Sequence, residues 1–179
     1  MKEQNVIANP ENDGIIKSEN TKALTVSASS VIIPNEKIRA EIINEAINSE
    51  TPFYDEDLRI AYKERNILQK EGCFDVMLHG TPMYTEYEKR YILDNETLYY
   101  IISGRRDWKT QNIRLISCNT GRADENGDCV AQYLADHLGV NIYAPIDIVY
   151  INEGRLNVGE REQLSEKDGF KWFYPRKGG

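Results

Sequence analysis

Two short apolar stretches of the sequence each end at a side chain that can take part in covalent catalysis. The stretch "FDVMLHGTP" (74–82) leads to His79, and "IRLISCNTG" (113–121) leads to Cys118. Both contain the apolar, partly β-branched residues typical of buried strands, followed by small or turn-forming residues. A thiolate is a strong nucleophile, and an imidazole can take the thiol proton and pass it to a leaving group. The two residue types together indicate nucleophilic catalysis.

The chain between these stretches predicts that they become neighbouring parallel strands. A helix ending near Gly104 is expected there, because the apolar residues after the acidic start "DNET" share one helical face. A strand, a crossover helix and a second strand form the βαβ pattern of a parallel sheet. Reactive residues collect at the carboxyl ends of such strands, which lie about 4.8 Å apart. We therefore expect the side chains of His79 and Cys118 to approach each other at the rim of the sheet.

Gly80 adds an element that acyl-transfer chemistry needs. This glycine directly follows the candidate base in "LHGTP". A residue without a Cβ lets a substrate carbonyl approach the backbone, and its N–H can stabilise an oxyanion. The backbone N–H of Cys118 is the expected second donor.

This combination of residues resembles the caspase-like cysteine peptidases of clan CD. In caspases the histidine precedes the cysteine by about 50 residues, and here a strand with His-Gly at its end precedes a strand ending in Cys. Over residues 74–150 the chain is similar to the bacterial branch, the cysteine peptidase domains of clostridial and MARTX-type toxins and related effector modules. The resemblance implies that Cys118 is the nucleophile, His79 the general base or acid and Gly80 an oxyanion donor. The segment "SCNTG" departs from the caspase "QACRG".

The resemblance also implies a specificity pocket near the strand that follows the nucleophile. Asp147 and Glu153 lie in that region, and Asp124 or Asp128 can serve instead. A pocket lined by carboxylates would select Arg or Lys before the cleaved bond. The related toxin domains bind inositol hexakisphosphate on a basic surface. Here the basic clusters "EYEKRY" and "GRRDWK" have acidic neighbours, so we expect no such activator and no cofactor.

Two other functions fit the same residues. A non-catalytic caspase-like binding module would keep the cysteine and histidine as relics, because a lone cysteine at a strand end is most often a small buried hydrophobe. A Cys-His acyl-transfer enzyme, such as a glutamine deamidase, needs the same dyad as a peptidase. A phosphotyrosine phosphatase is excluded, because its Cys-x5-Arg loop requires arginine at position 124, where the chain has Asp124.

Composition limits the partners of the chain. Its 179 residues are 40% hydrophobic and 28% charged, as in soluble globular proteins, and no apolar run reaches the roughly 18 residues of a membrane span. The net charge of −7 argues against a nucleic-acid surface. A protein or peptide substrate, from a host or rival cell if the toxin resemblance holds, is the expected partner.

Cysteine usage and the start of the chain bear on its location. Three cysteines without a CxxC pair, together with two histidines, predict neither a disulfide framework nor a metal site, and they fit a reducing compartment. The start "MKEQNVIANPENDG" has no apolar region of a secretory signal peptide. With the toxin resemblance, this predicts a protein of the bacterial cytoplasm that is delivered outside or into a target cell by a non-Sec route.

The expected architecture is one α/β domain over residues 31–179, after a mobile leader over residues 1–30. We expect a mostly parallel central sheet flanked by helices, of caspase-like type. One helix follows its N-cap Asn35, and another closes at Gly139. A C-terminal hairpin that turns at Glu153–Gly154 and a final strand in "GFKWFYP" complete the domain.

Overall fold

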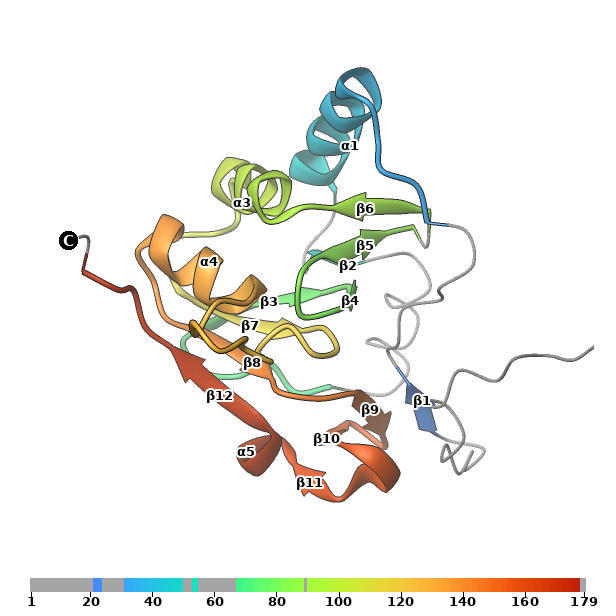
Figure 1. The fold of residues 1–179 in the computed structure, drawn as a ribbon, viewed down its shortest axis with the longest axis vertical. Coiled ribbons are helices and arrows are strands. Elements are labelled where there is room, and N and C mark those ends of the chain that lie inside the picture. Colours follow the sequence, from blue (N-terminus) through green and yellow to red (C-terminus); the bar gives the residue numbers. More distant parts are fainter. Residues whose placement is uncertain (1–20, 24–30, 50–52, 55–66, 89, 178–179) are drawn as a thin grey trace, which may run out of the picture.

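The computed structural model describes residues 21–23, 31–49, 53–54, 67–88 and 90–177. In this part of the chain, a central sheet packs helices on one face and a second sheet on the other (Figure 1). Residues 21–23, which we assigned to the leader, form a strand that pairs within the second sheet, and the rest of 1–30 lies outside the described residues. Among the described helices, none has the length and apolar character needed to cross a membrane.

The central sheet has five strands in the order β12-β8-β7-β3-β2. They are β2 (Phe53–Tyr54), β3 (Cys73–Met77), β7 (Asn112–Ile116), β8 (Ile142–Pro145) and β12 (Phe170–Phe173). Four of them run parallel, and β12 is antiparallel to β8 at the edge. The predicted mixed α/β class, the mostly parallel sheet and the parallel pairing of the two candidate strands are confirmed.

Three helices cover one face of this sheet (Figure 1): α1 (Glu36–Asn48), α3 (Asn95–Gly104) and α4 (Val130–Leu138). Their starts and ends follow local signals. The side chain of Asn35 accepts the Ile38 N–H and caps α1, and Asp94 caps α3 in the same way. Gly139 ends α4 in the left-handed conformation. Alternate strand residues, such as Val76 and Leu115, pack with these helices in the larger of two core clusters.

The opposite face of the central sheet packs against a second, antiparallel sheet. This sheet has the order β1-β9-β10-β11, with β1 (Thr21–Ala23), β9 (Val149–Asn152), β10 (Arg155–Val158) and β11 (Leu164–Ser165). Glu153 and Gly154 join β9 to β10, and both have positive φ, as a type I′ turn requires. The predicted C-terminal hairpin is confirmed. The 3-10 helix η1 (Glu160–Glu162) and the short helix α5 (Glu166–Gly169) connect this sheet to β12.

A third, three-stranded sheet lies between β3 and α3 in the chain, and the sequence patterns did not predict it. It is antiparallel, with the order β4-β5-β6. Its strands are β4 (His79–Gly80), β5 (Thr85–Tyr87) and β6 (Tyr91–Leu93). Strands of two or three residues are too short for an alternating pattern to stand out.

The ladder between β3 and β7 carries a buried ion pair. Asp75 and Arg114 are register partners, and both are almost fully buried. The Arg114 guanidinium donates from Nε to Asp75 Oδ1 at 2.8 Å and from Nη2 to Oδ2 at 2.6 Å. It also donates to Glu166 Oε1 at 3.2 Å and to the Leu68 carbonyl at 2.8 Å. The pair fixes the strand register, because a slip would leave two charges buried without their partners.

Replacing Arg114 with Leu should lower the free energy of unfolding by about 3–5 kcal/mol, because the Asp75 carboxylate stays buried without its partner. Urea denaturation measures the change. Arg106→Leu, at an exposed arginine of the same chain, is the matched control and should shift stability by no more than about 0.5 kcal/mol. A loss for Arg114→Leu within the roughly 1 kcal/mol of a surface ion pair would contradict this role.

Candidate functional site

The register of β3 and β7 brings the ends of these strands together. Every paired residue lies 39 positions from its partner, up to the last pair, Met77 with Ile116. His79 and Cys118 are separated by the same 39 positions. The Leu78 N–H donates to the Ile116 carbonyl at 3.3 Å, so the pairing continues one residue beyond β3. His79 and Cys118 each follow the last pair of the ladder by two residues.

The sequence predicted that His79 ends the strand that begins near Phe74, and this prediction is wrong. β3 ends at Met77, and His79 begins β4, where it pairs with Glu86 of β5. Only 4% of His79 is exposed, so it is a buried residue and does not lie at an exposed rim. The histidine therefore stands at the junction of the central sheet and the three-stranded sheet.

Cys118 lies in the loop after β7, where it has no exposed surface and packs in the second core cluster. The Val149 N–H donates to the Cys118 Sγ at 3.2 Å. A backbone donor aimed at sulfur stabilises negative charge on it. The next residue, Asn119, donates its N–H to the Asp147 carbonyl at 3.1 Å, so the loop is held against the segment between β8 and β9.

The other two cysteines have surroundings that disfavour a thiolate. None of Cys73, Cys118 and Cys129 forms a disulfide. Burial raises the pKa of the Cys73 thiol, and the Asp75 carboxylate adds to this effect. Burial likewise raises the pKa of the Cys129 thiol. Both residues belong to the packed interior.

Gly80 packs closely against neighbouring residues. From the sequence, we expected open space here for a substrate carbonyl. A Cβ on Gly80 would overlap the Ser117 Oγ and lie 2.8 Å from Thr120 Cγ2 and 2.9 Å from the Cys118 carbonyl oxygen. The space on this side of the glycine is therefore filled by the loop that carries the candidate nucleophile. Because Gly80 has no side chain, β4 can lie directly against that loop.

Glu86 is a residue that the sequence analysis missed. It is fully buried, and neither carboxylate oxygen has a hydrogen-bond partner among the described residues. Burial raises the pKa of its carboxyl to about 7. It stands opposite His79 in the β4–β5 ladder. The segment "YTEY" offers no signal for this burial, because Thr85 and Glu86 are adjacent polar residues and both are buried.

Two more buried polar groups lie around the same junction. The hydroxyls of Thr85, the register partner of Gly80, and of Ser117 also lack a hydrogen-bond partner in the described part of the chain. Buried polar groups are almost always hydrogen-bonded, so exceptions indicate a functional site or a bound molecule. Here they surround the junction of His79, Gly80 and the loop of Cys118.

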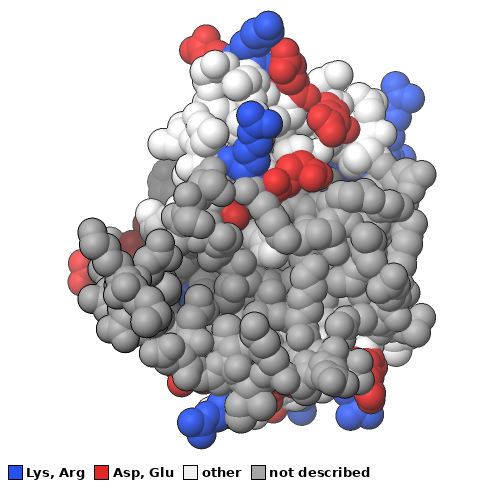
Figure 2. All heavy atoms as spheres, turned by 90° about the vertical axis from the view of Figure 1, so that its right-hand side faces the viewer, with Lys and Arg blue, Asp and Glu red and all other residues white. Residues whose placement is uncertain are grey.

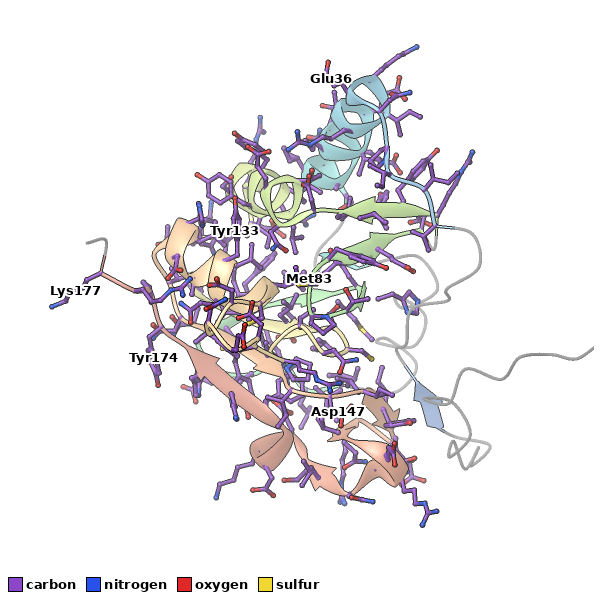
Figure 3. The ribbon with its side chains drawn as sticks, viewed as in Figure 1. Glu36, Met83, Tyr133, Asp147, Tyr174 and Lys177 are labelled. Atoms are coloured by element: carbon purple, nitrogen blue, oxygen red, sulfur yellow. The ribbon has the colours of Figure 1, made fainter. Side chains whose placement is uncertain are left out.

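The acidic residues predicted to form a specificity pocket are not brought together. Asp147 lies between β8 and β9 (Figure 3), next to the loop of Cys118. Glu153 follows β9, at the opposite end of that strand from Val149, the donor to sulfur. Asp124 lies in the loop before α4 and lines a separate cavity. Asp128 lines the same cavity as Asp124, so of the four predicted residues Asp147 is the one positioned near the Cys118 loop.

That cavity, of about 270 Å³, lies between the β4–β5 turn and α4, where Figure 3 labels Met83 and Tyr133. Its charged lining consists of Asp124, Asp128, Asp136 and Arg176, with His137 beside them. Arg176 pairs with Asp128 at 2.8 Å and with Asp136 at 2.7 Å. The cavity lies on the α4 side of the sheet, whereas Cys118 packs on the opposite face, so it is separate from the Cys118 side chain.

The basic cluster at "GRRDWK" has a structural role through Arg105. This buried side chain donates to the Ala46 carbonyl at 2.6 Å and to Ser49 Oγ at 2.8 Å, and pairs with Asp107 at 2.9 Å. It therefore joins α3 to α1. On the face in Figure 2, basic and acidic side chains of the described residues intermix around α1. Within the described ranges, no group of three or more His, Cys, Asp or Glu residues could hold a metal ion.

Gly80→Ala should lower the free energy of unfolding by about 1–3 kcal/mol, because the added Cβ overfills the contact with the Cys118 loop. A urea melt measures the loss. Adding Ser117→Gly should restore part of it, because the overlap with the hydroxyl disappears while the contact with the Cys118 carbonyl remains. An unchanged melt for Gly80→Ala would show that this contact is loose.

Glu86→Gln should gain stability over the wild type as the pH rises. The folded carboxyl has a pKa of about 7 against its usual 4.5, so the folded state binds this proton more tightly than the unfolded chain. Its stabilising effect is complete below pH 4.5 and is lost as the pH rises through 7. At 1.36 kcal/mol per pKa unit, the variant gains about 3 kcal/mol relative to the wild type between pH 4.5 and 8. Urea denaturation at both pH values tests this, and a difference independent of pH contradicts it.

Comparison with known proteins identifies the family but no function. No curated protein and no protein of solved structure matches the chain. A family model described as a domain of unknown function, DUF8616, matches residues 48–163, about two thirds of the chain. This range includes His79, Glu86 and Cys118. The chain therefore belongs to the DUF8616 family.

Proposed function

We propose that the chain is a cysteine peptidase in which Cys118 is the nucleophile and His79 the general base and acid. The observation that supports this most is the shared offset of 39 residues: His79 and Cys118 follow the last β3–β7 pair, Met77 with Ile116, by two residues each. The Val149 N–H at 3.2 Å from the sulfur adds support, because it favours the thiolate.

In this reaction, His79 takes the proton of the Cys118 thiol, and the thiolate forms a bond to the carbonyl carbon of the scissile peptide. The C–N bond then breaks, and the imidazolium gives its proton to the leaving amine. Water, deprotonated by the same imidazole, attacks the thioester. This step releases the carboxylate product and returns the thiol.

The carbonyl oxygen becomes an oxyanion during both attacks and requires hydrogen-bond donors. The Asn119 N–H is occupied by the Asp147 carbonyl at 3.1 Å, so it does not serve in this conformation. The N–H groups of Cys118 and Gly80 are the proposed donors. Gly80 takes this role through its backbone, in addition to its packing against Ser117.

The proposed substrate is a protein or peptide with a basic residue before the cleaved bond. Asp147 supports this choice, because it is the predicted specificity residue that the fold places beside the Cys118 loop. Cys118 has no exposed surface, so the substrate reaches the sulfur only when the surrounding segments move apart. The resemblance to toxin and effector peptidases extends the proposal to delivery by a non-Sec route and action on proteins of a host or rival cell.

A non-catalytic caspase-like module is the second candidate, and one observation favours it. Cys118 packs among Met77, Ile116 and Val149 in a hydrophobic cluster, where a thiol can serve as a small apolar side chain. A third candidate, a glutamine deamidase, needs the same Cys-His dyad. The mass of a treated peptide distinguishes hydrolysis of the chain from loss of ammonia at a side chain.

Alkylation by iodoacetamide, followed by peptide mass analysis, tests the dyad. At pH 7 Cys118 should react about tenfold or more faster than Cys73 and Cys129, because the proposed imidazole partner takes its proton, whereas burial raises the pKa of the other two thiols. His79→Gln should reduce this rate to that of the other two thiols and lower peptide cleavage by about 10²–10⁴.

His137→Gln is the matched control, because His137 stacks on Tyr133 of α4 and lies apart from Cys118. It should leave both rates unchanged. Equal alkylation of all three cysteines in the folded wild type would exclude the dyad and favour the non-catalytic module.

A further inference from the structure

We propose that Glu86 is a positioning residue that orients the imidazole of His79 and stabilises its charged form. This inference rests on the proposed function and completes it as a Cys118–His79–Glu86 arrangement. In such an arrangement the carboxylate holds the imidazole in one tautomer and favours the imidazolium that forms when the thiol loses its proton.

The ladder between β4 and β5 places the two residues together. Glu86 and His79 are direct antiparallel register partners. Residues directly opposite each other project to the same face of the sheet, with Cβ atoms about 4.5–5.5 Å apart. A glutamate side chain is long enough to reach an imidazole nitrogen across this distance.

The opposite face of β5 packs toward the helices. Tyr87, the neighbour of Glu86, packs in the larger core cluster, and its hydroxyl donates to Glu45 of α1 at 3.3 Å. Side chains alternate along a strand, so Glu86 points away from α1. Its partner on β6 is Ile92. Among the described residues paired with Glu86, His79 is therefore the one that can share a proton with it.

The contrast with Asp75 shows that Glu86 is not a usual structural carboxylate. Asp75 is buried to a similar extent, but the Arg114 guanidinium binds both of its oxygens. The carboxylate oxygens of Glu86 have no hydrogen bond to any described residue, and burial raises the pKa of this carboxyl to about 7. A buried carboxyl without partners costs stability, and such a cost is retained where the group has a function.

The test compares Glu86→Gln, Glu86→Asp and the control Glu45→Gln with the wild type. The chain has two histidines, so the ring protons of His79 can be assigned by NMR with the help of His137→Gln. Glu86→Gln should shift the midpoint of the His79 titration to lower pH by about one unit or more, because the imidazolium loses a carboxylate partner. In Glu86→Asp the downward shift of the His79 midpoint should be smaller, because a carboxylate remains. Glu45→Gln should leave the His79 titration unchanged.

Cysteine alkylation over pH 5–9 gives a second measurement on the same variants. In Glu86→Gln the rate at Cys118 near pH 7 should fall about tenfold while the melting temperature at pH 8 rises, which is the opposite of what a damaged fold would show. A His79 titration that is identical in Glu86→Gln and the wild type overturns the inference. This outcome is separate from the proposed function, which fails instead if wild-type Cys118 reacts no faster than Cys73 and Cys129.

Discussion

The parallel ladder between β3 and β7 is the constraint on which the rest of the site depends. Its register is fixed inside the sheet by Asp75 and Arg114, whose bidentate ion pair tolerates no slip of one strand along the other. The same register determines which residue beyond β3 meets which residue beyond β7. The ion pair lies four residues before each candidate catalytic residue, so in the proposed dyad it helps to align His79 with Cys118.

The end of this ladder combines dense packing with polar groups that lack partners. Gly80 packs so closely on Ser117 and the Cys118 carbonyl that an added Cβ would force these neighbours to shift. The hydroxyls of Thr85 and Ser117 and the carboxyl of Glu86 are nevertheless buried without hydrogen-bond partners in the described part of the chain. A fold selected for stability alone would fill such positions with apolar residues. The combination is typical of a site where stability is reduced for the sake of chemistry.

The elements that the sequence predicts correctly are those with local causes. The cap Asn35, the helix-ending Gly139 and the turn at Glu153–Gly154 act within a few residues, and the structure has each of them. Periodic apolar residues in α3 and α4 are similarly local signals.

What the sequence does not predict depends on partners far apart in the chain. β4, β5 and β6 are too short for a pattern, so the departure of His79 from β3 and the burial of Glu86 are visible only in the fold. The sequence placed Asp147 and Glu153 near the predicted specificity pocket, with Asp124 or Asp128 as alternatives. In the structure Asp147 lies beside the Cys118 loop, Glu153 in the β9–β10 turn and Asp124 at the cavity beside α4, and these positions depend on long-range packing. Asp75 and Arg114 would be expected at a surface from their charge alone, and each is buried because of the other.

The central claim is that the thiol of Cys118 and the imidazole of His79 interact across the end of the ladder. The most direct measurement is the NMR titration of the His79 ring in the wild type and in Cys118→Ala, with His137 as an internal reference in the same spectra. If the two groups interact, removing the thiol should move the His79 titration by about half a pH unit or more and leave His137 unchanged. A His79 curve that is the same in both proteins would contradict the claim.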